Sequence, residues 1–286
     1  MKKLCLSLLL AGLLVALTAC SDPGITMKEV YEANRPAVLL ENHESVCARF
    51  TVDGEDAGVN YVGKEYTYDA AYGWACFMTD EIAYNCEGDT YHRVVPVCED
   101  GLVDVADYRA AYDVRLLMDK TTARETVESV TEQDGRLTVS TQLPAKYLLE
   151  LTQGQEGVKA CRCEYVLDAD TCALISGQSV CDFEDGTSFT VTSEMTYDEA
   201  LPDQARAFLA LEEQGVQLRT VTLVTNPGTQ REKIQNVQVA KGLSVRLDAG
   251  MGEGTLTLYA DAACTQPYIA PGEHESDATV YLKWTE

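Results

Sequence analysis

The sequence predicts a mainly β fold, in which one large antiparallel sheet with a few helices is followed by a small β domain. About eleven short runs rich in Val, Tyr, Thr and Phe follow one another along the chain, with turn residues between them. Helical periodicity interrupts these runs at few places, which argues against alternating βαβ units and a parallel sheet. The expected strands are 46–52, 60–70, 74–79, 82–86, 90–98, 113–119, 126–133, 136–142, 158–167, 172–183 and 187–197.

An N-terminal helix is expected before the first strand. Thr26 and Glu29 have the spacing of a capping box, in which each side chain accepts a hydrogen bond from the backbone of the other residue. Pro36 lies within the apolar pattern that follows, so residues 27–42 form either one kinked helix or two short ones. Two further helices are expected to begin at prolines and end at glycines, at 144–154 and 202–215.

Asp134-Gly135 is the strongest hairpin signal in the chain, because a two-residue turn needs positive φ at its centre. This turn sets Val130 opposite Val139 on the paired strands. A second hairpin is expected to turn at residues 168–171, which are rich in Asp and Thr.

Residues 1–20 have the layout of a secretory signal. Lys2 and Lys3 precede an uncharged, Leu-rich stretch that is too short to span a bilayer. This stretch ends in Leu17-Thr18-Ala19-Cys20, which resembles the lipobox of bacterial lipoproteins. The resemblance implies that Cys20 is acylated with chains such as palmitate and anchors the protein, through a short tether at 21–25, to the extracytoplasmic face of the cell membrane. An ordinary cleaved signal is the alternative.

The chain carries a formal charge of −24, from 22 Lys and Arg against 46 Asp and Glu. Nucleic-acid binding is excluded as a function class, because that binding depends on Lys and Arg that neutralise phosphates. Anionic lipid headgroups would repel this chain, so the expected membrane anchor is the covalent lipid on Cys20. Hydrophobic residues still make up 46% of the chain, which is enough for a folded core.

The excess of acidic residues lies almost entirely before residue 219, and the segment 219–286 is close to neutral. This asymmetry predicts a domain boundary near residue 216. The expected organisation after the signal peptide and tether is a sheet domain at 26–215 and a small domain at 216–286.

The sheet domain contains the turn Tyr165-Val166-Leu167-Asp168-Ala169-Asp170-Thr171-Cys172, after an N-terminal helix, many antiparallel strands and an inserted helix. In this order of elements it resembles the half-barrel of the LolA and LppX type lipid-carrier lipoproteins. The resemblance implies a curved sheet around an apolar hollow that binds a lipid or another hydrophobic ligand. Candidate residues for the cavity wall, with ordinary core packing as the alternative, are Tyr66, Tyr68, Trp74 and Met78.

The C-terminal segment ends in Asp277-Ala278-Thr279-Val280-Tyr281-Leu282-Lys283-Trp284, after several short strands. This pattern is similar to the Listeria-Bacteroides β-grasp module of the internalin B-repeat type. The sequence Leu256-Thr257-Leu258-Tyr259 departs from the Gly-Trp-Tyr of that module, and the chain has one copy. The resemblance implies a single module that caps the sheet domain or docks on a protein or cell-wall partner.

Eleven cysteines are present, and nine remain once Cys5 leaves with the signal and Cys20 is acylated. Disulfides are the usual state of exported cysteines, and an odd number leaves at least one thiol unpaired. If the loop between two expected strands centres on Glu81, Cys76 faces Cys86 across a hairpin. This pair is the candidate disulfide.

Two other cysteines are poorly placed for a disulfide with each other. Cys161 and Cys163 share one face of a strand, where a bridge between residues i and i+2 is hard to form. Several cysteines are therefore expected either to pair elsewhere or to remain reduced as small buried hydrophobic side chains.

The sequence predicts neither a metal site nor a catalytic centre. Paired C-x-x-C spacing does not occur, and no G-x-S-x-G or other nucleophile signature accompanies His43, His92 or His274. Asp168 begins a stretch similar to a calcium loop, but Ala173 stands where that loop needs Gly. The protein is therefore expected to be non-enzymatic and to have no cofactor and no bound metal.

The predicted function is that of a membrane-anchored surface lipoprotein which binds a lipid or other hydrophobic ligand in a half-barrel cavity. The alternative is an interaction or adhesion protein, with a filled scaffold sheet and a C-terminal module at 216–286 that binds a protein or the cell wall. A cavity large enough for an acyl chain supports the carrier, whereas a filled interior with an exposed apolar patch supports the adhesion protein.

Overall fold

The computed structural model of the chain describes residues 24–112, 118, 120–148, 157–213, 217–269 and 274–285. These residues fall into two compact units, one made of the chain up to 38 with 117–192, the other of 39–116 with the chain from 193 onward. The fold is mainly β, with a large antiparallel sheet and few helices, as the sequence predicts. The signal peptide with Cys20 lies outside the described residues, as do residues 21–23 of the tether.

The N-terminal segment forms two short helices, α2 (Met27–Ala33) and α3 (Pro36–Asn42). The predicted capping box is confirmed, since the Thr26 backbone N donates to Glu29 Oε2 at 2.9 Å and the Glu29 backbone N donates to Thr26 Oγ1 at 3.3 Å. Pro36 is the first residue of α3, where its missing N–H costs no helical bond. The two-helix alternative is therefore correct.

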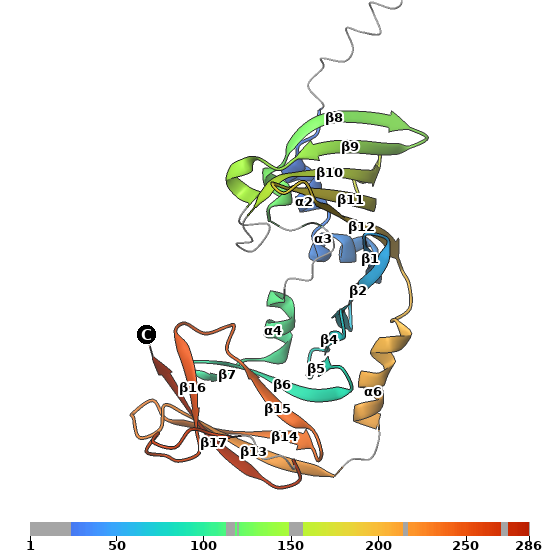
Figure 1. Ribbon diagram of the computed structural model, residues 1–286. Coiled ribbons are helices and arrows are strands. Elements are labelled where there is room, and N and C mark those ends of the chain that lie inside the picture. Colours follow the sequence, from blue (N-terminus) through green and yellow to red (C-terminus); the bar gives the residue numbers. More distant parts are fainter. Residues whose placement is uncertain are drawn as a thin grey trace, which may run out of the picture. The chain divides into compact units, whose positions relative to one another are not determined.

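In the first unit the strands pair in the order β8-β9-β10-β11-β12, and β12 runs on into the second unit (Figure 1). The Asp134-Gly135 hairpin is confirmed, with φ of 52° and 72° at its centre and with Val130 opposite Val139. Short 3₁₀ helices occur at η2 (Thr122–Arg124) and η3 (Ala145–Tyr147), and residues 149–156 of the helix predicted at 144–154 lie outside the described residues. The strands are β8 (Thr126–Gln133), β9 (Arg136–Gln142), β10 (Val158–Asp168), β11 (Leu174–Phe183) and β12 (Ser188–Tyr197).

The turn between β10 and β11 is the predicted hairpin. Asp168 Oδ1 accepts hydrogen bonds from the backbone N of Asp170 at 3.1 Å and of Thr171 at 2.8 Å. Buried Asn34, which ends α2, fixes this turn, because it accepts from the Leu174 backbone N at 2.7 Å and donates to the Cys172 carbonyl at 2.9 Å. The carboxylate of Asp168 thus serves the turn itself.

In the second unit β1 to β6 form an antiparallel meander. The single strand predicted at 60–70 is wrong, because the Gly63 backbone N donates to the Tyr66 carbonyl at 2.7 Å and closes a tight turn there. Of the strand predicted at 113–119, residues 113–117 and 119 lie outside the described residues. The elements are β1 (Ser45–Val52), β2 (Glu55–Gly63), β3 (Thr67–Ala71), β4 (Trp74–Met78), β5 (Ala83–Glu87), β6 (Thr90–Cys98), β7 (Gly101–Leu102) and α4 (Val105–Ala111).

The later part of the second unit begins with η4 (Asp203–Ala205) and α6 (Arg206–Glu213), within the helix predicted at 202–215. A four-stranded sheet follows in the order β14-β13-β17-β16, with β13 and β17 parallel. β15 (Ser244–Asp248) instead pairs in parallel with β6. The strands of the smaller sheet are β13 (Leu218–Thr225), β14 (Lys233–Ala240), β16 (Thr255–Tyr259) and β17 (Ala278–Thr285).

One hydrophobic core joins the smaller sheet to β6. Val95 and Val97 of β6 pack in the same buried cluster as Leu223 and Leu282 of the smaller sheet. The C-terminal strands therefore belong to the second compact unit, and the boundary near residue 216 stays a prediction, as does the β-grasp resemblance.

Candidate functional site

An aromatic cluster fixes α6 on one face of the meander. Phe208 of α6 is 2% exposed and stacks on Phe77 of β4, with ring centroids 5.5 Å apart and an interplanar angle of 12°. Tyr91 of β6 meets the same ring edge-on at 5.2 Å, and Tyr68 of β3 does so at 6.2 Å. Because aromatic pairs gain from such geometry beyond the area they bury, Phe208 holds the helix at one place on the sheet.

Beside this cluster lies an open cavity of about 740 Å³. Seven of its lining residues are Ala or Gly, whose small side chains leave space. Tyr68 contributes an aromatic ring, and the start of η4 forms one border. Trp74 borders the cavity at the end of β4, and its side chain packs in the cluster of Cys76 and Met78. The full lining is Arg49, Asp56, Ala57, Gly58, Val59, Tyr68, Ala70, Ala71, Tyr72, Gly73, Trp74, Ala75, Cys86, Gly88, Pro202, Asp203 and Gln204.

A β-bulge shapes the floor of the cavity. Phe50 pairs with Gly58 and Thr51 pairs with Asp56, so Ala57 is the extra residue on β2. Gly58 has φ of +149°, and a Cβ there would lie 2.1 Å from the Ala70 carbonyl oxygen of β3. Only glycine allows this close approach of two strands, and the bulge bends β2 beside the cavity.

The border of the cavity carries charge of both signs. Arg49 Nη2 and Glu199 Oε2 lie 2.7 Å apart, and this hydrogen bond raises the pKa of Arg49 and lowers the pKa of Glu199. Asp203, which also lines the cavity, pairs with Arg206 at 3.1 Å. The cavity lining therefore combines apolar and aromatic side chains with charged ones.

Of the four predicted wall residues, Tyr68 and Trp74 line the cavity. Tyr66 packs outside it against Phe77, with ring centroids 5.8 Å apart. Met78 is fully buried on the opposite face of the sheet, in the cluster that includes Tyr108 of α4. For Tyr66 and Met78 the core-packing alternative is the one that the structure shows.

The predicted disulfide between Cys76 and Cys86 is wrong in its register. Cys86 lies opposite Ala75, and Cys76 lies opposite Asn85, so the two thiols point to opposite faces of the sheet. Burial raises the pKa of Cys76 to about 12 and also raises the pKa of Cys86, which makes both of them poor nucleophiles.

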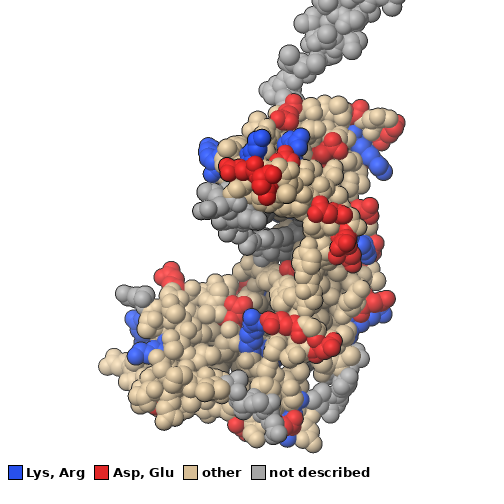
Figure 2. Space-filling model, viewed as in Figure 1, with Lys and Arg blue, Asp and Glu red and all other residues tan. Residues whose placement is uncertain are grey.

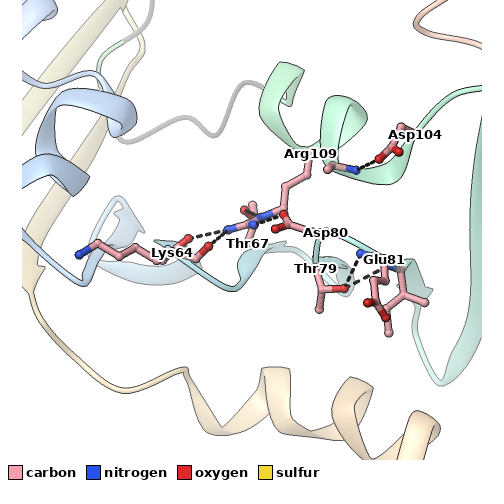
Figure 3. A network of polar contacts seen from close by, with 10 residues as sticks. Lys64, Thr67, Thr79, Asp80, Glu81, Asp104 and Arg109 are labelled. Atoms are coloured by element: carbon pink, nitrogen blue, oxygen red, sulfur yellow. Dashed lines mark hydrogen bonds and ion pairs between the residues drawn. The ribbon is translucent and has the colours of Figure 1, made fainter.

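The register follows from an even-numbered loop between β4 and β5. Thr79 Oγ1 accepts hydrogen bonds from the backbone N of Glu81 and of Ile82, both at 3.1 Å, and pins the loop (Figure 3). Met78 therefore pairs with Ala83, and the centre of the hairpin falls between Asp80 and Glu81 instead of on Glu81.

Arg109 of α4 clamps two loops of the meander (Figure 3). Its guanidinium donates to the Gly63 carbonyl at 2.6 Å and to Thr67 Oγ1 at 3.1 Å, and it pairs with Asp80 at 2.6 Å. The clamp joins the β2–β3 turn to the β4–β5 loop and so holds the strands that carry the cavity. No motif in the sequence singles out Arg109.

Two of the three histidines make polar side-chain contacts. His43 Nδ1 contacts Asp198 at 2.9 Å, and His92 Nδ1 contacts Ser244 Oγ of β15. Within the described residues, no group of three or more His, Cys, Asp or Glu side chains is arranged to hold a metal ion. On the face in view in Figure 2, Asp and Glu side chains form several clusters, in keeping with the charge of −24.

Comparison with known proteins gives distant likenesses in structure only. No family model matches the chain, and no curated protein matches its sequence. The lipoprotein LppX of Mycobacterium tuberculosis is similar over 64% of this chain and 99% of its own, with 11% identity and a TM-score of 0.36. The MucA/MucB complex structure from Pseudomonas aeruginosa is similar over 62% of this chain and 59% of that one, with 8% identity and a TM-score of 0.28.

The helices of the described chain are too short or too polar to cross a bilayer.

Proposed function

We propose that the protein is a non-enzymatic surface lipoprotein, anchored to the extracytoplasmic face of the cell membrane through a lipid on Cys20, that binds a hydrophobic ligand in the cavity of the second unit. The observation that carries this proposal is the cavity itself, whose volume of about 740 Å³ lies within the usual range for small-molecule sites. Its small lining residues and the aromatic ring of Tyr68 suit an acyl chain or a flat apolar group. The charged border suits a ligand with one polar end.

Ligand binding can be tested through Trp74, one of the two Trp residues of the chain. In a chain with Cys20→Ala and Trp284→Phe, Trp74 is the remaining Trp, so a bromine-labelled fatty acid in the cavity is expected to quench its fluorescence to saturation. Ala70→Phe fills the floor and is expected to abolish the quenching. Ile269→Ser, an exposed position that does not line the cavity, is the matched control. Equal quenching in the Ala70→Phe chain, or none in the parent, would contradict the proposal.

The anchor has a separate test. In cells, the unchanged chain is expected in the membrane fraction, and Cys20→Ala is expected to release it into the soluble exported fraction, because the acyl chains provide the binding energy. A Cys20→Ala chain that stays with the membrane would overturn the lipid anchor and leave the ligand-binding proposal standing.

A protein partner for the C-terminal strands is the second candidate. Ile234 of β14 is 65% exposed and Leu218 of β13 is 57% exposed, and β14 is an edge strand of its sheet. Exposed apolar side chains on an unpaired strand edge favour docking of another chain. In this candidate, Ile234→Lys is expected to abolish capture of the partner from surface extracts, and equal capture by both chains would count against it.

A further inference from the structure

The buried face of the first unit carries a cluster of thiols and polar groups on neighbouring strands. Cys161 and Cys163 of β10 and Cys181 of β11 are 1%, 6% and 4% exposed. Glu125, which precedes β8, and Tyr165 of β10 join them, with Tyr165 Oη donating to Glu125 Oε1 at 2.9 Å. None of these residues lines the proposed ligand-binding cavity.

Cys161 and Cys181 have the geometry of a cross-strand pair. They lie directly opposite each other in the antiparallel register of β10 and β11, and their Sγ atoms are 3.2 Å apart. Directly opposite residues in such a pair have Cα atoms about 4.5–5.5 Å apart, which is within the range for a disulfide. A covalent bond between them needs the sulfur atoms to approach by only about 1 Å.

Cys163 follows Cys161 two residues along β10 and lies among polar groups. Its thiol contacts Ser179 Oγ at 3.2 Å and lies 3.6 Å from Glu125 Oε1. Hydrogen bonds, of which that with Cys161 is the largest cause, lower the pKa of Cys163 to about 6 against the effect of burial. Burial, followed by the charge of Cys163, raises the pKa of Glu125 to about 8, so the carboxyl group keeps a proton that it can share with the Cys163 sulfur.

We propose that Cys161 and Cys181 form an oxidation site, which becomes a cross-strand disulfide by exchange with a low-molecular-weight disulfide. Because both sulfur atoms are buried in the folded chain, the first exchange takes place before the hairpin closes, and pairing of β10 with β11 then brings Cys161 to the mixed disulfide on Cys181.

The chemistry balances in two exchanges. The Cys181 thiolate attacks one sulfur of the oxidant RSSR, the S–S bond breaks, and one RS⁻ leaves. Cys161 then loses its proton to water and attacks the Cys181 sulfur, which forms the protein disulfide and releases the second RS⁻. Two protein thiols are oxidised, RSSR is reduced to two RSH, and the two protons pass to the released thiolates.

The test uses the full chain with Cys5→Ala and Cys20→Ala, so that only the nine described cysteines remain. The unfolded, reduced chain is refolded with oxidised glutathione, the free thiols are alkylated, and the disulfide is located by non-reducing peptide mapping. The expected result is a peptide linked through Cys161 and Cys181, a mass lower by two hydrogen atoms, and a thermal unfolding midpoint higher than that of the reduced chain. Alkylation of both residues, or a link from either one to another cysteine, would overturn the proposal.

Variants separate the pair from its neighbour. Cys161→Ser is expected to lose the linked peptide, and Cys76→Ser, another buried cysteine, is expected to keep it; circular dichroism shows that each variant folds. Cys163→Ser is expected to keep the link, because Cys163 is not the residue opposite Cys181. Loss of the link in a folded Cys163→Ser chain would contradict the pairing.

Discussion

The cavity of the second unit and the thiol cluster of the first unit are both built on faces of antiparallel strands, and they differ in what occupies those faces. The strands beside Phe208 present alanine, glycine and aromatic side chains, and space is left between them. In the first unit, β10 and β11 present thiols and hydroxyls, and these contact one another and the carboxyl group of Glu125, which precedes β8. The first arrangement is suited to binding an apolar molecule, and the second to proton and sulfur chemistry.

Two buried cysteines differ in the pKa of their thiols. Cys76 lies opposite Asp69 and Asn85, and burial, followed by the charges of Asp69 and Asp248, raises its pKa to about 12. Cys163 is buried to a similar degree, but hydrogen bonds from Cys161 and its other polar neighbours lower its pKa to about 6. Burial alone therefore does not decide the reactivity of a thiol; the hydrogen-bond donors around the sulfur decide it.

The largest effect on the cavity side is expected from Phe208→Ala. Truncation removes the ring that Phe77, Tyr68 and Tyr91 pack against, and the loss of such a buried aromatic side chain costs about 3–5 kcal/mol of unfolding free energy. Urea denaturation of the two chains measures this loss. Phe208→Leu keeps most of the volume and is expected to cost less than half as much. Equal costs for the two variants would show that aromatic packing does not hold α6.

Gly58→Ala is expected to have the next largest effect, about 2–3 kcal/mol of unfolding free energy together with loss of ligand binding, because the new Cβ would collide with the Ala70 carbonyl. Gly73→Ala is the matched control, since Gly73 also has positive φ but has open space where a Cβ would lie. Its expected cost is about 1 kcal/mol, from backbone strain alone. Urea denaturation and the Trp74 quenching assay give both readouts, and similar values for the two variants would contradict the close-approach argument.

On the thiol side, Glu125→Gln is expected to change the pH dependence of stability. The pKa of Glu125 is raised from 4.5 to about 8, so in this window the folded chain holds a proton that the unfolded chain releases, and stability falls as the pH rises. The lowered pKa of Cys163 acts in the opposite direction from about pH 6 to 9. The fall due to Glu125 is therefore clearest between about pH 4.5 and 6.

Urea midpoints of the reduced chain at several pH values in that window measure the effect. Glu125→Gln is expected to remove the decline that the parent chain shows. Parallel profiles for the two chains would mean that the Glu125 carboxyl group does not retain its proton on folding.

The smallest effect is expected from Arg49→Gln at the border of the cavity. Arg49 and Glu199 are half and about one-third exposed, so their ion pair contributes less than about 1 kcal/mol to stability. If a ligand places a negatively charged end at Arg49, the variant is expected to weaken binding of a fatty acid more than binding of the matching fatty alcohol. If the variant weakens binding of both ligands equally, Arg49 does not recognise the charged end of the fatty acid.

The sequence predicts elements well where a local rule decides them. The capping box at Thr26 and the Asp134-Gly135 hairpin are both confirmed, because caps and two-residue turns depend on a few adjacent residues. No such local rule predicts the strand register that places Cys76 and Cys86. It depends on the Thr79 side chain, which closes an even-numbered loop and turns the two thiols to opposite faces.

The candidate sites depend on contacts between distant segments, which periodicity does not reveal. Tyr68 and Trp74 line the cavity because a bulge at Ala57 and the approach of η4 leave space beside them. The pairing of Cys161 with Cys181 depends on the 168–171 turn and on a register shift between Val166 and Leu167, without which Cys161 would lie opposite Val180. The one available signal was the alternation of Cys161, Cys163, Tyr165 and Leu167 on a single strand face.

The central claim, that the cavity holds a hydrophobic ligand, is tested most directly by native mass spectrometry. The chain with Cys20→Ala is purified gently from its own cells, beside the same chain with Ala70→Phe. If the cavity holds a ligand, the first chain is expected to carry a bound hydrophobic mass and the second to show the bare polypeptide mass. Bare polypeptide for both chains, or the same bound mass on both, would contradict it.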